Sequence, residues 1–410
     1  MLLSIFLIVL VDVFAFTLIF PLLAIYAEHL GATPLEATLL VSIFAVCQLV
    51  SGPLLGRISD RLGRKPMLIV SQIGTFVGLL VMARAQTLWV LFVARTIDGA
   101  TAGNLSLAQA YIADNTAPEN RARSFGLIGI AFGLGFFLGP SVTGYLVHYG
   151  LRAPIYAAAA LSLASILCTA LLLPHQKGTA RAAELDGDPG PGGKRLALLD
   201  WGAYAQYLSR PVLAGLLAQM LLFSFSFTTF TSGFALFAER TFRWNDHPFT
   251  PREIGYLFAY AGFLGIILQG GLIGRLVKRF GEPPLVAAGF AAMGLAYLCL
   301  GMIHEVPPLV AVATLAAFGH GVLRPTLTSL ITQNAGRHEQ GVVLGLNQSL
   351  TSIAQVLAPP LGGLLIGRAL LPEWAFVAAL AAGLGLLATR WGSGRVVAPA
   401  ASATSIDASS

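Results

Sequence analysis

The stretch GPLLGRISDRLGRKP, residues 52–66, places basic side chains among glycines in an otherwise apolar chain of 410 residues. A related stretch, GGLIGRLVKRFGEPP, occupies residues 270–284. The positions shared by the two stretches are Gly52, Leu54, Gly56, Arg57, Arg61, Gly63 and Pro66, which match Gly270, Leu272, Gly274, Arg275, Arg279, Gly281 and Pro284. A pattern that recurs in both halves of a chain indicates an internal duplication.

A second pair of stretches supports the duplication. RARSFGLIGIAFGLGFFLGPSVTGYL at 121–146 aligns with QGVVLGLNQSLTSIAQVLAPPLGGLL at 340–365. This alignment matches Gly126 with Gly345, Pro140 with Pro359 and Gly144 with Gly363. Parallel repeats around a central site are one design of secondary transporters, which rock one half against the other.

The composition is that of a membrane protein. Hydrophobic residues make up 56% of the chain and charged residues 11%, whereas about a quarter of the residues of a soluble protein are charged. Apolar runs such as residues 3–27 are continuous and reach the roughly 20 residues that a spanning helix needs. Strands of a membrane barrel would alternate instead, so the predicted fold class is an all-α membrane protein.

The apolar runs predict twelve transmembrane helices in two pseudo-symmetric halves of six. The expected spans are 3–27, 36–56, 67–85, 88–113, 124–147, 153–173, 212–237, 252–274, 284–303, 307–332, 342–366 and 373–391. We expect an N-terminal half at 1–173, a linker at 174–210, a C-terminal half at 211–392 and a disordered tail at 393–410. Within the linker, residues 196–208 are predicted to form a short interfacial helix.

The distribution of Lys and Arg predicts the orientation. Most of the 25 basic residues fall in the tail and in the loops on the side of the N-terminus. The loops on the other side hold only Arg84, Arg152, Arg240, Arg243, Arg252 and Arg368. By the positive-inside rule both termini should lie in the cytoplasm. The net charge of +6 comes from these short loops, so we expect a lipid bilayer and no nucleic acid as the partner.

The repeated loop contains the elements of a gate on the cytoplasmic side. Asp60 and Arg64 are four residues apart and can pair on one helix face. Gly52 and Gly56 permit close approach of another helix, and Gly63 permits a tight turn. We interpret Asp60, Arg61 and Arg64 as a latch between the halves; the alternative is that the basic residues only anchor the topology.

Charged side chains inside spans are costly in hydrocarbon and usually face a partner or a wet cavity. Arg95 and Asp98 are three residues apart and can neutralise each other, either as a structural ion pair or as part of proton exchange. Asp12 has no cation on its own helix, so it is the preferred proton carrier. His320 and Arg324 share one face of a later span, where His320 is a second candidate for the proton or a structural histidine.

Two further helices carry recognisable faces. Phe223, Phe227, Phe230 and Phe234 recur at helical spacing and form a stripe that either lines a cavity for an aromatic substrate or packs in the core. In residues 121–146, glycines form a face without side chains that allows close helix packing, and Pro140 can bend the helix.

These stretches resemble a known family. GPLLGRISDRLGRKP resembles the loop between helices 2 and 3 of the major facilitator superfamily, and GLGFFLGPSVTG at 133–144 resembles the helix-5 motif of its drug/proton antiporters. VARTIDGATAG at 93–103 is similar to their helix-4 motif. AYIADNTAPENRARSFG at 110–126 and FAERTFRWND at 237–246 are most similar to the tetracycline/proton antiporter branch.

The resemblance implies roles for particular residues. It implies that Gly135, Gly139, Pro140 and Gly144 are antiporter-motif residues, that Arg95 is the motif arginine, and that Asp114 is a further partner of the latch. That branch carries acidic residues in helices 3 and 9, and residues 67–85 and 283–303 contain none. The resemblance therefore does not imply tetracycline as the substrate.

The expected function is a secondary active transporter, namely a proton-coupled exporter of a small amphipathic organic compound. The alternative is a facilitator or a proton symporter for a metabolite such as a sugar or an organic anion. No nucleotide-binding loop, HExxH motif or Cys/His cluster is present, so we expect no enzyme, no metal and no cofactor, with a proton gradient as the energy source. We expect a monomer in a bacterial inner membrane.

Overall fold

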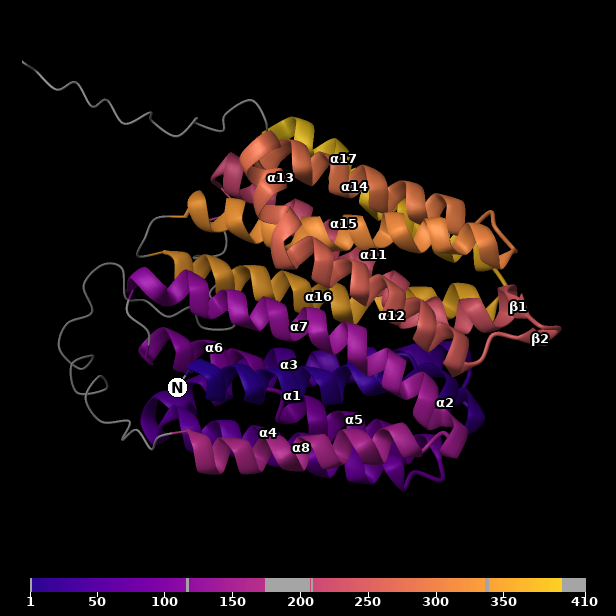
Figure 1. The fold of residues 1–410 in the computed structure, drawn as a ribbon, viewed down its shortest axis with the longest axis horizontal. Helices are drawn as coiled ribbons and strands as arrows, with labels where there is room; N and C mark the ends of the chain where they lie inside the picture. The colour runs from indigo at the N-terminus through magenta and orange to yellow at the C-terminus, as the bar shows by residue number, and fades with distance from the viewer. Residues whose placement is uncertain (1, 116–117, 174–206, 208, 336–338, 393–410) are drawn as a thin grey trace, which may run out of the picture.

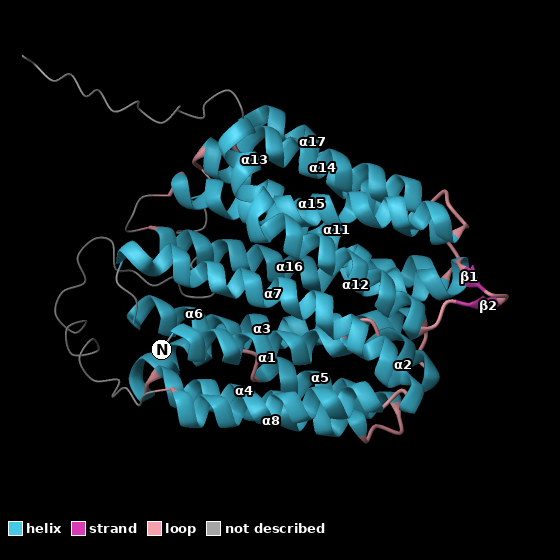
Figure 2. Ribbon diagram, viewed as in Figure 1, coloured by secondary structure: helices cyan, strands magenta, loops and turns pink. Residues whose placement is uncertain are grey.

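The structure is a computed structural model that describes residues 2–115, 118–173, 207, 209–335 and 339–392. Almost all of these residues are helical, and one two-stranded hairpin projects from one end of the helix bundle (Figures 1 and 2). The predicted interfacial helix at 196–208, the linker before it and the tail after Gly392 lie essentially outside the described residues.

The N-terminal half runs from indigo to magenta in Figure 1. Its helices are α1 (Leu2–Ile19), α2 (Leu23–His29), α3 (Pro34–Leu62), α4 (Arg64–Ala83), α5 (Leu88–Ala100), α6 (Asn104–Asn115), α7 (Pro118–Leu146), the 3₁₀ turn η1 (Val147–Tyr149) and α8 (Ala153–Leu172).

The C-terminal half runs from pink to yellow in the same view. Its elements are α11 (Pro211–Thr241), the strands β1 (Arg243–Trp244) and β2 (His247–Pro248), α12 (Pro251–Ile267), the π-helical turn η2 (Leu268–Leu272), α13 (Ile273–Phe280), α14 (Glu282–Leu300), α15 (Val306–Gln333), α16 (Gln340–Gly367) and α17 (Leu371–Gly392). The strands pair antiparallel, with Arg243 opposite Pro248 and Trp244 opposite His247.

The described residues contain 11 segments long and apolar enough to cross a membrane. The remaining expected span, 88–113, is divided into α5 and α6 of 13 and 12 residues. The twelve-helix fold is therefore confirmed, with this span interrupted.

Two expected spans were predicted as single helices and are interrupted. The first, 3–27, breaks at Phe20–Leu22, because Pro21 has no N–H to continue the helical hydrogen bonds. The other, 88–113, breaks between Ala100 and Asn104. There the hydroxyl of Ser71 on α4 accepts from Gly103 N (2.9 Å) and donates to Thr101 O, which satisfies backbone groups that lipid cannot.

The duplicated motif forms the same turn twice. Gly63 ends α3 with φ +98° and Gly281 ends α13 with φ +80°. The N–H of each donates to a carbonyl of the last helical turn, from Gly63 to Ser59 and from Gly281 to Val277. A positive φ of this kind favours glycine, which explains why the repeat keeps a glycine at this position.

The two ends of the bundle are named here by what they carry. The basic end, on the left in Figure 1, contains the Gly63 and Gly281 turns, and the hairpin end, on the right, contains β1 and β2. The halves pack against each other through α3 with α16 and through α7 with α12.

Candidate transport site

Arg95 and Asp98 form an ion pair inside the N-terminal half. Arg95 Nη1 lies 2.8 Å from Asp98 Oδ2, and both residues are buried. The guanidinium also donates to Leu40 O on α3 (3.3 Å) and lies 4.3 Å from the centre of the Phe44 ring. The pair is enclosed by α3, α4 and α5, so the two charges compensate each other within the N-terminal half.

Asp12 faces the interior of the same half. Its Oδ2 accepts from Gln72 Nε2 of α4 at 3.4 Å, and the same nitrogen donates to Ser165 Oγ of α8 at 2.8 Å. Gln72 Oε1 is buried and has no hydrogen-bond partner in the structure. No described Lys or Arg forms an ion pair with Asp12, so neutral groups alone accommodate this carboxyl.

His320 belongs to an aromatic cluster of the C-terminal half. Its Nε2 lies 2.5 Å from the Tyr297 hydroxyl of α14, and its ring lies edge-on to Phe227 at 4.7 Å. Phe230 stacks on Tyr297 at 5.0 Å. The structure thus places His320 among rings and a hydroxyl, and places no described carboxylate against it.

The phenylalanine stripe of α11 divides into two kinds of side chain. Phe223 and Phe234 are buried, at 4% and 1% exposure, whereas Phe227 and Phe230 are only half-buried. Phe234 packs against Phe258 of α12 at 5.5 Å. Two members of the stripe are therefore core residues, and the other two retain a surface that another molecule could contact.

Arg324 reaches from the C-terminal half to the N-terminal half. Its side chain is exposed, and its Cζ lies 5.6 Å from the centre of the Phe132 ring on α7. No described acidic residue forms an ion pair with it. His320 lies one helical turn away on the same face of α15.

The glycine motif in α7 is a packing surface. A Cβ at Gly135 would lie 2.6 Å from Val13 Cγ1, and one at Gly139 would lie 2.1 Å from Thr17 Oγ1, both on α1. A Cβ at Gly144 would lie 3.1 Å from Arg252 O on α12. The face therefore joins α7 to its own half and, near its end, to the other half.

The predicted latch pair is formed locally. Arg64 Nη2 lies 2.7 Å from Asp60 Oδ1, and Arg64 Nη1 donates to Ser59 Oγ at 2.5 Å. Arg61 is exposed. The expected partner Asp114 lies in α6, but its side chain is outside the described residues.

The second copy of the loop makes different polar contacts. Glu282, which takes the place of Arg64, accepts from Ser329 Oγ (2.6 Å) and from Gln333 Nε2 (3.0 Å) on α15. Lys278, which takes the place of Asp60, is exposed. The repeated loop is thus conserved in backbone geometry and not in its polar contacts.

The structure brings in residues that the sequence patterns did not single out. Gln72 and Ser165 hold Asp12, Tyr297 holds His320, and Phe132 meets Arg324. Gln72 carried the one available signal, because an amide within an apolar span usually has a partner on another helix. The other contacts join positions with no shared sequence pattern.

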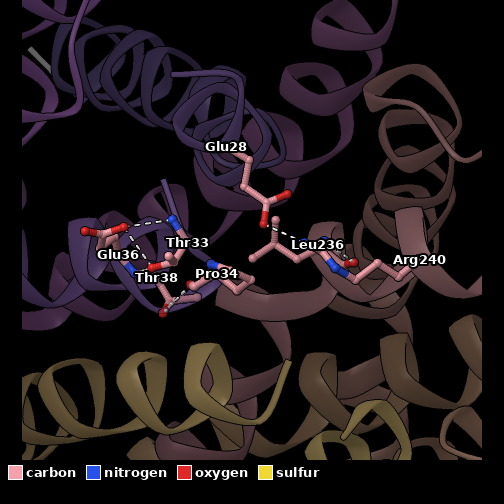
Figure 3. Close-up of polar contacts among 7 residues, drawn as sticks. All are labelled: Glu28, Thr33, Pro34, Glu36, Thr38, Leu236 and Arg240. Carbon is pink, nitrogen blue, oxygen red and sulfur yellow. Dashed lines mark hydrogen bonds and ion pairs between the residues drawn. The ribbon is translucent and has the colours of Figure 1, made fainter. Parts of the chain in front are cut away.

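An ion pair between the halves closes the hairpin end. Arg240 Nη2 of α11 lies 2.6 Å from Glu28 Oε1 of α2, and Arg240 Nη1 donates to Leu236 O (Figure 3). Thr38 lies nearby and donates back to Pro34 O of its own helix at 3.1 Å. This pair was also not predicted, because its partners are 212 residues apart.

Comparison with known proteins places the chain in a family. The family model described as Major Facilitator Superfamily matches residues 5–273 and 246–405. The chain is 30% identical to "Tetracycline resistance protein, class C" of Escherichia coli over 334 residues, 81% of this chain and 78% of that protein. It is 29% identical to "Multidrug resistance protein 1" of Bacillus subtilis over 338 residues, 82% of each chain.

A solved structure supports the fold. The human organic anion transporter MFSD10 (TETRAN) superposes with a TM-score of 0.71 over 95% of this chain and 98% of that chain, at 22% identity. A likeness at this identity concerns the fold alone. From the family match, the relatives and the helical fold together, the chain belongs to the Major Facilitator Superfamily and is an integral membrane transporter of small molecules, not an enzyme.

Proposed function

We propose that this transporter is a proton-coupled exporter of a small amphipathic organic compound. The relatives named as tetracycline and multidrug resistance proteins support export of such compounds. The Lys and Arg distribution supports an orientation with both termini and the basic end in the cytoplasm. The bacterial relatives support the inner membrane, and each chain works as a monomer by alternating access.

The observation that carries the proposal is the setting of Asp12. An ionised carboxyl group within a membrane span is costly unless a cation compensates it, and only neutral groups hold Asp12. The Gln72 amide suits both protonation states, because its N–H donates to the ionised carboxyl and its unpaired Oε1 can accept from the protonated one. Asp12 can therefore take up and release a proton as the packing around it changes.

The arrangement of the halves supports a transport cycle in which this structure is the state open to the cytoplasm. The halves are in contact at the hairpin end, and at the basic end no described atom lies within 4 Å of the Cβ position of Gly52 or Gly274. A substrate would enter from the basic end, and the halves would then close there and part at the hairpin end.

The test uses inside-out membrane vesicles with an imposed proton gradient and a pH-sensitive dye. A panel of amphipathic compounds is added to vesicles with the wild type, Asp12→Asn and Asp246→Asn. Asp246 is an exposed residue of the hairpin turn with φ +63°, a conformation that asparagine also adopts, so this variant is the matched control.

We expect a compound that dissipates the gradient with the wild type and with Asp246→Asn but not with Asp12→Asn. Uphill transport that is unchanged in Asp12→Asn would contradict the role of Asp12. If compounds cross equally without a gradient and no protons move, the protein is a facilitator and Asp12 is structural.

A further inference from the structure

We propose that the substrates of the site between the halves are aromatic anions, bound by the Arg324 guanidinium between the rings of Phe132 and Phe227. This inference rests on the proposed transport function and specifies the charge of what is carried. The sequence alone leaves this charge open, because Asp12 and Asp98 formally balance Arg95 and Arg324.

Only one of these four charges is available to a ligand. Arg95 and Asp98 neutralise each other at 2.8 Å and are buried. Asp12 is bonded to Gln72 within its own half. Of these four residues, Arg324 alone combines an exposed side chain with the absence of an ion-pair partner among the described residues.

Arg324 approaches the N-terminal half. Its Cζ lies 5.6 Å from the ring centre of Phe132, which belongs to the other half. Arg324 is therefore exposed at the boundary between the two halves. It lies nine residues before the end of α15, about 13 Å into the membrane from the basic end at 1.5 Å per residue. A ligand entering from the basic end would reach it.

Aromatic side chains lie near Arg324. Phe132 stacks on Phe136 (6.5 Å, 22° between ring planes), which holds one ring beside Arg324. His320, one turn away at about 6 Å, meets the edge of the half-buried Phe227 ring and is held by Tyr297. A flat aromatic ligand would therefore find Phe132 of one half beside the cation and Phe227 of the other half one helical turn away along α15.

The chemistry of the guanidinium group favours an anionic ligand. Its planar N–H groups match the paired oxygens of a carboxylate or sulfonate, and such charge-assisted bonds are strong where water is scarce. A cationic ligand would instead meet a like charge that no described carboxylate offsets. The preferred ligand is an aromatic ring system that carries one anionic group.

The experiment compares two permanently charged probes with the same ring in reconstituted proteoliposomes. The probes are naphthalene-1-sulfonate and (1-naphthylmethyl)trimethylammonium, whose fluorescence reports uptake, and a dye reports protons. The variants are Arg324→Gln, Arg324→Lys and the control Arg368→Gln, which changes an exposed arginine at the end of α16.

We expect the wild type and Arg368→Gln to transport the sulfonate at least about tenfold faster than the ammonium probe, which is the loss expected for one charge-assisted contact. Arg324→Gln should lose that preference, and Arg324→Lys should retain part of it. The wild-type preference is itself a test if a variant fails to fold. Equal rates for the two probes, a preference for the cation, or no flux of the sulfonate would overturn the inference.

The same experiment separates this inference from the proposed function. If the sulfonate crosses in an Arg324-dependent way and no protons move, the substrate class is right and proton coupling is wrong. If the ammonium probe is exported in exchange for protons and the sulfonate is excluded, the proton-coupled function is right and the substrate class is wrong.

Discussion

The hairpin end and the basic end of the helices that join the halves use glycine in opposite ways. Toward the hairpin end, a Cβ at Gly262 of α12 would lie 2.7 Å from the Phe136 backbone, and one at Gly363 of α16 would lie 2.6 Å from Pro34 O. Toward the basic end, Gly52 of α3 and Gly274 of α13 have no described atom within 4 Å of that position.

The difference shows which contacts exist in this state and which are left unmade. At Gly262 and Gly363 the backbones of opposite halves approach closely because one of the two residues is a glycine, as small residues allow in membranes. Gly52 of α3 and Gly274 of α13 have no such neighbour among the described residues. We interpret them as a contact surface for a second arrangement, in which the basic end is closed and the hairpin end open.

The largest effect on stability is expected from Gly262→Ala. The new methyl group would collide with the backbone of Phe136 and Phe137, which cannot move as a flexible side chain would. Overpacking of this kind costs about 1–3 kcal/mol. Thermal unfolding in detergent and transport should both fall.

The matched control for Gly262→Ala is Gly265→Ala in the same helix. No described atom of a neighbouring segment lies within 4 Å of the position that a Cβ at Gly265 would take. There alanine should be neutral or should stabilise the helix by up to about 1 kcal/mol. Equal losses from both substitutions would show that the contact of Gly262 with the other half does not explain the loss.

A smaller effect is expected from the Glu28–Arg240 ion pair. Because both side chains are partly exposed, we expect the pair to stabilise the closed hairpin end by about 1 kcal/mol or less. This corresponds to a change of up to about fivefold in the ratio of molecules with the hairpin end closed to molecules with it open. Glu28→Gln, Arg240→Gln and the double variant form a double-mutant cycle.

The readout for this cycle is maleimide labelling of Thr38→Cys in a chain whose three cysteines are replaced. Thr38 is fully buried at the hairpin end beside Gly363, so its labelling rate reports opening there. Each single variant should raise the rate and the double variant should add little more. Additive effects in the double variant would show that the two side chains do not act as a pair.

The smallest effect on stability, with a large effect on transport, is expected from Gly52→Leu. Nothing described occupies the space beside Gly52 in this state, so the chain should fold normally. The leucine would block approach of the other half when the basic end closes. Gly383→Leu in α17, which also has open space and is not on an interface helix, is the control. Normal transport by Gly52→Leu would contradict the proposed second arrangement.

Much of the fold could be predicted from the sequence for physical reasons. Lipid forces spanning segments into helices, so the apolar runs predicted the helices. The repeated glycines Gly63 and Gly281 indicated tight turns, because a positive φ favours glycine. The break between α5 and α6 could not be predicted, because it depends on the hydroxyl of Ser71 on another helix. The Arg95–Asp98 pair was accessible to prediction, because both residues lie on one helix at fixed spacing.

The sequence by itself therefore determined the membrane environment, the helical fold, the duplication and the local ion pairs. These follow from composition and from spacing along a single helix. Only the tertiary structure decided that Asp12 turns to Gln72, that Arg324 crosses to Phe132, and that the halves meet at Glu28 and Arg240. These contacts join helices far apart in the chain. Their geometry depends on how the helices pack, and no periodicity along the sequence records it.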